Sequence, residues 1–203
     1  MSNLVKDPLN IIISGVGGQG NILASELVAS ALVEKGFYTT VGETYGASQR
    51  GGSVMSHVRV SEKKQYGPLI PRGEADIIVG FEPIETLRIA REYANKATQV
   101  IVNTWPNYPI GVLCGEAVYP EMSAIQKELE YLCGKVTVIE ATNLAQELGN
   151  SQATNIVLVG SLAAWDGMPL TLNDYDQVLS QRFKPKVLEL NRQAFSVGYN
   201  KML

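Results

Sequence analysis

The sequence has few of the side chains that bind metal ions, since its 203 residues include two cysteines and one histidine. Cys114 and Cys133 form no Cys-x-x-Cys pair, and two thiols alone cannot complete a zinc site or a four-cysteine iron–sulfur cluster. A disulfide is unexpected, because the polar first ten residues do not resemble a secretion signal. We therefore expect free, buried thiols and no metal site in this chain.

Strong charge of one sign and long apolar runs are missing as well. The 17 basic and 20 acidic side chains give a net charge of −3, and the basic ones are scattered along the chain. This balance disfavours a nucleic-acid surface. The longest apolar stretch, residues 156–165, is too short to span a bilayer. We expect a cytoplasmic protein without a membrane segment.

A glycine-rich loop is the most informative feature that is present. An apolar run ends in Gly15-x-Gly17-Gly18-Gln19-Gly20, and a helical pattern follows at once. A strand, a tight turn and a helix start aim backbone N–H groups at one spot, where a phosphate can bind. Gly17 and Gly18 would admit the anion because they lack side chains, and Gln19 could add a polar contact. Alternatively, the glycines only permit a sharp turn and close helix–strand packing.

Apolar periodicity predicts one α/β domain over residues 1–203, with a Rossmann-like, mostly parallel sheet flanked by helices and an antiparallel strand addition. Residues 53–60 alternate in polarity, which indicates a half-exposed strand that is antiparallel or at an edge. Residues 154–165 fit a strand or, given their length, a buried helix. The other strands are expected at residues 9–14, 37–41, 75–80, 99–103 and 136–139. The other helices are expected at residues 19–35, 84–94, 121–132, 141–148, 171–181 and 184–200.

Two finer expectations concern the later part of the chain. Residues 104–120 hold three prolines and are expected to be irregular. In the last helix, the apolar face is expected to consist of Val187, Leu190, Ala194 and Val197.

Several motifs, taken in order, resemble a known family. They are Gly15–Gly20, Glu43-Thr-Tyr-Gly-Ala-Ser-Gln-Arg-Gly-Gly52, Ser56-His-Val-Arg59, Pro68-Leu-Ile-Pro71, Glu74–Val79, Glu82-Pro83 and Val100–Thr104. In this order and spacing the sequence resembles the gamma subunit of 2-oxoacid:ferredoxin oxidoreductases. Within that family it is most similar to the small (beta) subunit of indolepyruvate ferredoxin oxidoreductase.

The resemblance implies a reaction that this chain would share with a partner. In the family, a 2-oxoacid is decarboxylated on thiamine diphosphate, electrons pass through iron–sulfur clusters to ferredoxin, and coenzyme A takes the acyl group. The sequence lacks the Gly-Asp-Gly…Asn signature of a thiamine–magnesium site. The family's division of labour therefore implies a larger partner subunit that carries thiamine diphosphate, magnesium and the clusters. This chain would be inactive alone, with coenzyme A possible at the interface between the subunits.

The segment between the second and third strands supplies further candidates. Arg50 lies among polar and glycine residues, and a guanidinium can clamp a carboxylate or phosphate with two hydrogen bonds. A 2-oxoacid and coenzyme A both offer such groups. Gln49, Gly51 and Gly52 flank Arg50 and are candidate binding residues with it. The alternative is that Arg50 pairs with Glu43 and fixes the loop.

Five more candidates lie at strands or strand ends. His57 could act as a general base at the partner's active site, or it is a structural hydrogen-bonding group. Tyr45 is either an interface aromatic or a loop anchor. Glu82, Asn103 and Thr104 follow strands, where α/β sheets place ligands. They could line the same crevice as the glycine loop, or they cap helices and loops.

Three alternatives to this function remain open. A stand-alone NAD(P)-dependent oxidoreductase would use the same glycine loop, with Glu43 on the ribose, although the expected second helix of that motif is missing. A gamma subunit of the 2-oxoglutarate or 2-oxoisovalerate type would differ only in its substrate. A binding or regulatory module would carry no chemistry at all.

Overall fold

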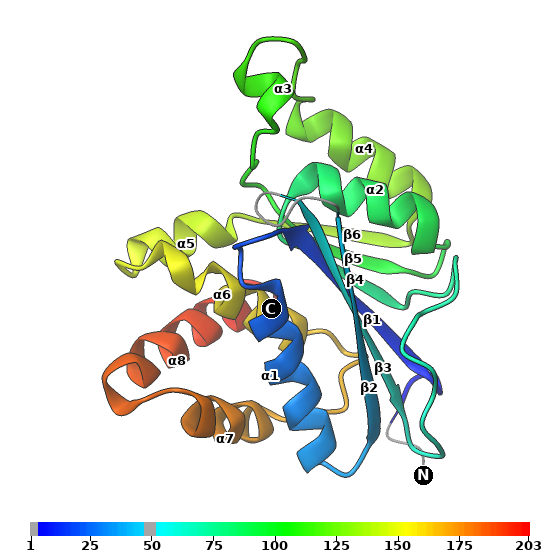
Figure 1. Cartoon of the computed structure of the whole chain (residues 1–203). Helices are drawn as coiled ribbons and strands as arrows, with labels where there is room; N and C mark the ends of the chain where they lie inside the picture. The colour runs from blue at the N-terminus through cyan, green and yellow to red at the C-terminus, as the bar shows by residue number, and fades with distance from the viewer. Residues whose placement is uncertain (1–3, 47–51) are drawn as a thin grey trace.

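The computed structural model describes residues 4–46 and 52–203. These residues form a six-stranded sheet in the order β2-β3-β1-β4-β5-β6 (Figure 1). β1, β4, β5 and β6 run parallel, whereas β3 is antiparallel to both of its neighbours. The strands are β1 (Leu9–Val16), β2 (Tyr38–Tyr45), β3 (Ser53–Ser61), β4 (Ile77–Gly80), β5 (Gln99–Asn103) and β6 (Lys135–Ile139).

Helices cover both faces of the sheet, with α2 and α4 on one face and α1, α6, α7 and α8 on the other (Figure 1). This confirms the predicted Rossmann-like α/β fold with an antiparallel addition. None of the described helices is long and apolar enough to cross a membrane. The helices are α1 (Asn21–Glu34), α2 (Pro83–Tyr93), α3 (Ile110–Leu113), α4 (Met122–Leu132), α5 (Ala141–Glu147), α6 (Thr154–Ala163), α7 (Leu172–Arg182), α8 (Pro185–Asn200) and the 3-10 turn η1 (Ser151–Ala153).

The core consists of two apolar layers, one on each face of the sheet. Ile11 and Ile13 pack in the layer under α1, α6, α7 and α8, whereas Ile12 packs in the layer under α2 and α4. All three side chains are almost completely buried. The uninterrupted isoleucine run follows from this arrangement, because a strand covered on both faces has no solvent side to make polar. Burial of each such side chain contributes roughly 1.5–3 kcal/mol.

β3 lies between β1 and β2, and it is buried rather than half-exposed, so that part of the prediction is wrong. The predicted antiparallel pairing is confirmed. One face of β3 packs against α1. The other face is covered by residues 66–70, since Arg59 donates to the carbonyl oxygens of Gly67 and Leu69 at 3.0 and 3.1 Å. A covering loop cannot be read from alternation within the strand itself.

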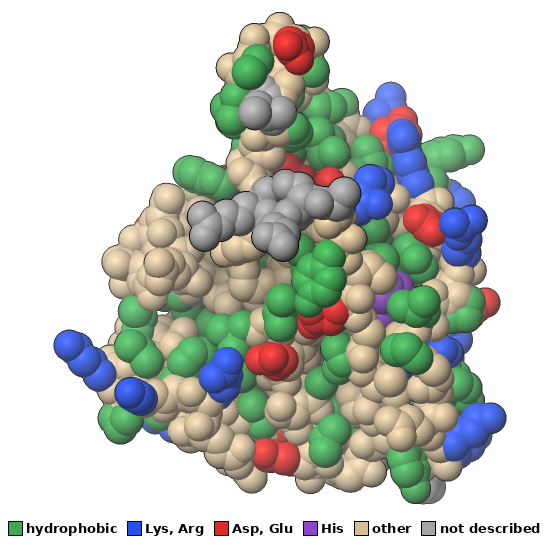
Figure 2. Space-filling view, in the orientation of Figure 1, with side chains coloured by type: hydrophobic (Ala, Val, Ile, Leu, Met, Phe, Trp, Pro, Cys, Tyr) green, Lys and Arg blue, Asp and Glu red, His purple; other side chains and the backbone are tan. Residues whose placement is uncertain are grey.

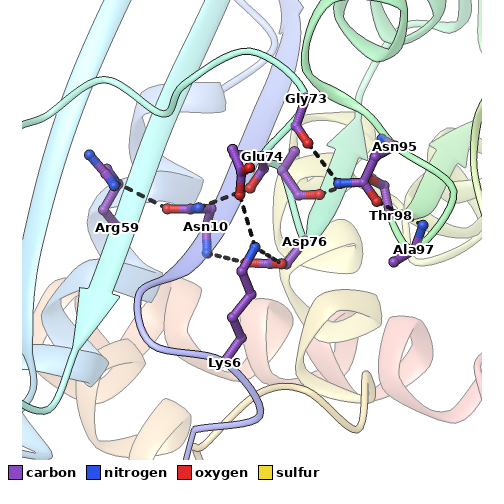
Figure 3. Close-up of polar contacts among 10 residues, drawn as sticks. Lys6, Asn10, Arg59, Gly73, Glu74, Asp76, Asn95, Ala97 and Thr98 are labelled. Carbon is purple, nitrogen blue, oxygen red and sulfur yellow. Dashed lines mark hydrogen bonds and ion pairs between the residues drawn. The ribbon is translucent and has the colours of Figure 1, made fainter.

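A polar network fixes the start of β1 against the turn that precedes β4 (Figure 3). Lys6 pairs with Glu74 at 3.2 Å and with Asp76 at 2.9 Å. Asp76 accepts the backbone N–H of Asn10 at 2.8 Å, and the Asn10 side-chain oxygen accepts from Arg59 Nε at 3.1 Å. The network ties β1, β3 and β4 together at the end of the sheet opposite the glycine loop.

Of residues 154–165, predicted as a strand or a buried helix, 154–163 form the helix α6, which crosses α8 at very close range. A Cβ added to Gly160 would lie 2.0 Å from the carbonyl oxygen of Phe195, and one added to Gly198 would lie 1.9 Å from that of Val157. The buried residues of α8 are Asn191, Ala194, Phe195 and Gly198. Of the predicted apolar face of α8, Ala194 is buried and Leu190 and Val197 are half-buried, whereas Val187 is exposed. The prediction is wrong at Val187, and the most buried face is rotated toward the glycine contact with α6.

Two smaller corrections concern residues 104–120 and the cysteines. The segment predicted as irregular contains the short helix α3. Cys133 is buried as expected, but Cys114 is exposed. Cys133 packs among the apolar side chains under α4, and its burial raises the pKa of the thiol to about 11.

Candidate functional site

The glycine loop joins the carboxyl end of β1 to the start of α1, as predicted. Gly18 and Gly20 have φ angles of +101° and +84°, which L-residues with side chains rarely adopt. Gln19 closes the turn, because its N–H donates to the carbonyl of Val16 at 3.2 Å and its Oε1 accepts the N–H of Val16 at 2.8 Å. The glycine spacing therefore serves the turn directly, and the Gln19 side chain is used within the loop.

Two of the glycines also permit close approach of neighbouring elements. A Cβ on Gly15 would lie 2.7 Å from the Cβ of Phe81, just beyond β4. A Cβ on Gly20 would lie 2.5 Å from Nδ2 of Asn155 in α6. The structural explanation for the motif thus holds at these two positions, and it leaves Gly18, where an added Cβ meets no described atom within 4 Å, free for a ligand role.

A cavity of about 420 Å³ opens beside the loop. Three helices begin at it, since Gly20 precedes α1, Thr142 lies in the first turn of α5 and Thr154 begins α6. The first turns of these three described helices contain no acidic side chain. The lining residues are Gly18, Gln19, Gly20, Trp105, Thr142, Ser151, Gln152 and Thr154.

The electrostatics of this cavity suit an anion. Helix N-termini carry a partial positive charge, and here the charges of several helices add, while the N–H of Thr142 donates to Asn103 and that of Ile156 to Asn155. The α1 cap, Gly20, offers no side chain to the first N–H groups of α1. The next residue, Asn21, is 3% exposed, and neither polar atom of its side chain has a hydrogen-bond partner among the described residues. Hydroxyl and amide groups of the lining can complete a phosphate's hydrogen bonds.

Glu82 is buried after β4 rather than exposed in the cavity. Its Oε2 accepts the N–H of Glu85 at 2.8 Å, so Glu82 caps α2 ahead of Pro83. Its Oε1 accepts the N–H of Asn107 at 3.3 Å and the hydroxyl of Tyr119. Burial raises the pKa of Glu82, while these hydrogen bonds act in the opposite direction.

Asn103 and Thr104 lie at the carboxyl end of β5. Asn103 is buried, donates to the carbonyl of Phe81 at 3.1 Å and to Thr142 Oγ1 at 3.0 Å, and accepts the N–H of Thr142 at 3.3 Å. Thr104 donates its N–H to the carbonyl of Ile139 at 3.0 Å. Asn103 therefore supports the cavity from behind by holding Thr142 and the start of α5.

The candidates from the segment after β2 divide into two groups. Gly52 contacts the glycine loop, because its carbonyl accepts the N–H of Gly17 at 2.8 Å. Gln49, Arg50 and Gly51 lie outside the described residues. Their proposed binding roles, and a pairing of Arg50 with Glu43, therefore stay predictions.

Glu43 and Tyr45 lie on β2, away from the cavity. Glu43 lines a separate groove between α1 and β2, and it accepts hydrogen bonds from Ser25 at 3.4 Å and from Tyr45. The hydrogen bond that the Tyr45 hydroxyl donates to Glu43 raises the pKa of Tyr45. Because β3 separates β2 from β1, Glu43 is not on the strand next to the glycine loop.

His57 is completely buried on the face of β3 that points toward α2. Its Nδ1 accepts the N–H of Ile70 at 3.3 Å, and its ring meets Tyr93 edge-on at 5.4 Å between centroids. Burial, followed by the charge of Arg59, lowers the pKa of His57. These contacts anchor the imidazole through Nδ1, while its buried Nε2 has no hydrogen-bond partner among the described residues, and a general-base role stays a prediction.

Five cavity residues escaped the sequence reasoning, namely Trp105, Thr142, Ser151, Gln152 and Thr154. Trp105 follows β5 and Thr142 follows β6, so both lie where parallel strands end. The mostly polar run from Asn150 to Thr154 lies between two helical patterns, which is a helix-start signal. These signals exist, but they do not show that the segments meet.

Residues 4–46 and 52–203 bring together no group of three His, Cys, Asp or Glu side chains that could hold a metal ion. The Cys114 side chain is exposed and that of Cys133 is buried, so the two thiols occupy different environments.

The sequence matches the family described as pyruvate ferredoxin/flavodoxin oxidoreductase over residues 10–201, and the chain belongs to this family. It is 39% identical to indolepyruvate oxidoreductase subunit IorB of Archaeoglobus fulgidus, with 96% of each chain covered. It is 40% identical to the protein of the same name from Thermococcus kodakarensis, with 93% of each chain covered.

Solved structures share the fold. The gamma subunit of a keto/oxoacid ferredoxin oxidoreductase from Geobacter sulfurreducens aligns with a TM-score of 0.68 at 23% identity, covering 96% of this chain and 98% of the other. A 2-oxoglutarate:ferredoxin oxidoreductase from Magnetococcus marinus aligns with a TM-score of 0.74 at 24% identity, covering 96% of this chain and 31% of the other. The predicted resemblance is confirmed, and the protein is an IorB-like, gamma-type subunit of a 2-oxoacid:ferredoxin oxidoreductase.

Proposed function

We propose that this chain is the cofactor-free small subunit of an oxidoreductase that converts an arylpyruvate, with indolepyruvate as the first candidate, to an acyl-coenzyme A while reducing ferredoxin. Thiamine diphosphate and iron–sulfur clusters, carried by a larger partner subunit, supply decarboxylation and electron transfer. The substrate assignment is supported by the four relatives at 33–40% identity, which all bear the name indolepyruvate oxidoreductase subunit IorB.

The residues of this chain do not fit the redox groups themselves. A four-iron cluster requires four thiolates, and this sequence has two cysteines. The described residues form no cluster of acidic, histidine or cysteine side chains that could hold magnesium beside a diphosphate. No step of the reaction is therefore assigned to a metal or thiamine group on this chain, and we expect the chain to be inactive alone.

One observation carries the part that we assign to this chain: the cavity of about 420 Å³ where α1, α5 and α6 begin. Its N–H groups and hydroxyls suit a phosphate, and coenzyme A is the phosphate-bearing reactant of this enzyme class. The related structure from Magnetococcus marinus was solved with coenzyme A bound. In our proposal, Gly18 admits the phosphate, Thr142 orients it, and Trp105 shields one side from water.

The strand order disfavours a stand-alone nicotinamide enzyme. In a dinucleotide site, an acidic residue on the neighbouring parallel strand contacts the ribose. Here the neighbour of β1 on that side is the antiparallel β3, and Glu43 is bonded to Ser25 and Tyr45. The glycine loop is thus separated from its usual acidic partner.

The experiment is co-expression with the thiamine- and cluster-bearing subunit of the same organism. Turnover is followed as coenzyme A-dependent reduction of ferredoxin, with indolepyruvate, pyruvate and 2-oxoglutarate compared. We expect activity only when both subunits are present, and fastest with indolepyruvate. Equal turnover without this chain, or nicotinamide-dependent activity of this chain alone, would contradict the proposal. Preference for another 2-oxoacid would overturn only the substrate assignment.

A further inference from the structure

Residues 104–120, which we call the arm, form the connection from β5 to α4 except for its last residue, Glu121, and project beyond the body of the protein (Figure 1). Connections of this length inside a compact domain are uncommon and usually have a function. The arm contains one acidic side chain, Glu116, and no lysine or arginine. Figure 2 shows mostly apolar and uncharged atoms on the projecting part.

The arm exposes large apolar side chains to water. Trp105 and Tyr108 are 44% and 48% exposed, whereas Leu113 and Val118 are 71% and 92% exposed. Trp105, Tyr108 and Leu113, together with Pro106 and Asn107, line a hollow of about 520 Å³ on the arm. A contiguous exposed apolar surface of this kind typically marks an interaction site.

The arm is held in a defined pose rather than loosely attached. Glu82 accepts the N–H of Asn107 near one end of the arm and the hydroxyl of Tyr119 near the other. Tyr119 also meets Tyr108 edge-on at 5.2 Å between ring centroids. Pre-ordering of this kind lowers the entropy that docking would cost.

The tip of the arm is closed by its own backbone. The carbonyl of Gly111 accepts the N–H groups of Glu116 and Ala117 at 2.8 and 3.0 Å. The apolar side chains of the tip are therefore displayed on a fixed turn.

We propose that the arm docks into an apolar, uncharged recess on the larger, thiamine-bearing subunit. This inference rests on the proposed function, which requires that partner. Two observations favour this occupant. The arm has one acidic side chain and no basic one, so the charges of a charged recess would find almost no partners on it. The arm is also continuous with the candidate site, because Trp105 lines both the arm hollow and the coenzyme cavity. Docking would place the cavity at the subunit interface.

The test uses the full chain and the full-length large subunit of the same oxidoreductase, with affinity measured by isothermal titration calorimetry. Leu113→Glu and Val118→Glu each place a charge on the exposed arm without touching the core. We expect each variant to bind the large subunit at least about tenfold more weakly. Val187→Glu is the matched control, because Val187 is 44% exposed on α8, away from the arm (Figure 1), and its affinity should stay at the wild-type value.

The outcomes separate this inference from the proposed function. If the wild type binds the large subunit and both arm variants bind equally well, the arm inference is wrong and the subunit function stands. If the arm variants and the control weaken binding alike, the loss is a general effect of the added charge, and the arm inference is wrong. If the wild type does not bind, the proposed function fails and docking fails with it. Circular dichroism of each variant confirms that the fold is retained.

Discussion

The N–H of Gly17 donates a 2.8 Å hydrogen bond to the carbonyl oxygen of Gly52. This bond joins the two motifs that are most informative in the sequence, the glycine loop and the segment before β3. It is possible because β3 lies directly beside β1, with Val16 opposite Ser53 in the antiparallel register. The antiparallel strand thus brings Gly52 into contact with the glycine loop.

A charge placed in the cavity should weaken coenzyme A binding. Gly18 has φ +101° and no described atom within 4 Å of an added Cβ, and Asn and Asp are the side chains that best tolerate positive φ. In the assembled enzyme, Gly18→Asp should raise the KM for coenzyme A about fivefold relative to Gly18→Asn, which corresponds to roughly 1 kcal/mol of lost helix-dipole attraction. Steady-state kinetics at low salt provide the measurement. Equal KM values for coenzyme A in the two variants would show that its phosphate does not bind beside Gly18.

The crossing of α6 and α8 should tolerate no side chain at its glycines. Gly198→Ala puts a methyl group 1.9 Å from the carbonyl oxygen of Val157, and a backbone atom cannot rotate away. We expect the free energy of unfolding to fall by about 3 kcal/mol, despite the better helix propensity of alanine. Urea denaturation measures the change. Gly67→Ala, with no described atom within 4 Å of the new Cβ, is the control and should change stability little.

Burial of His57 should make stability depend on pH. Its folded-state pKa is lowered from 6.5, by burial first and by Arg59 second. On acidification, His57 is therefore protonated in the unfolded chain at a higher pH than in the folded chain. The free energy of unfolding falls as the pH drops below 6.5 toward the folded-state pKa.

His57→Gln removes this titration while keeping an acceptor for Ile70. Urea denaturation at pH 7.5 and 5.5 should show the wild type losing more stability than this variant. Because His57 is the only histidine, its imidazole resonances in an NMR titration report the pKa without assignment. A midpoint at or above 6.5 would refute the prediction.

Most elements could be predicted from local patterns, since their signals lie within single segments. Gln99–Asn103 was predicted with the bounds that the structure has, and the helix predicted at 84–94 differs from α2 by one residue at each end. The burial of β3 and the rotation of α8 were predicted wrongly, because each depends on a segment far away in the sequence. Arg59 holds the covering loop over one face of β3, and Val157 sets how α8 can lie.

The candidate site was predictable only in part. Gly18, Gln19 and Gly20 line the cavity, but the other lining residues come from segments that meet through the sheet. Glu82 and Asn103 were expected in the crevice because they follow strands. Their side chains are instead buried, where they hold the arm and the start of α5.

The sequence by itself determined the α/β class, the strand–loop–helix context of the glycines and the family, because apolar period and motif spacing are properties of neighbouring residues. Only the tertiary structure decided that three helices begin at one cavity and that Trp105 lines both this cavity and the hollow on the arm. Such convergence depends on the order in which strands assemble, and strand order is set by long-range packing rather than by any local pattern.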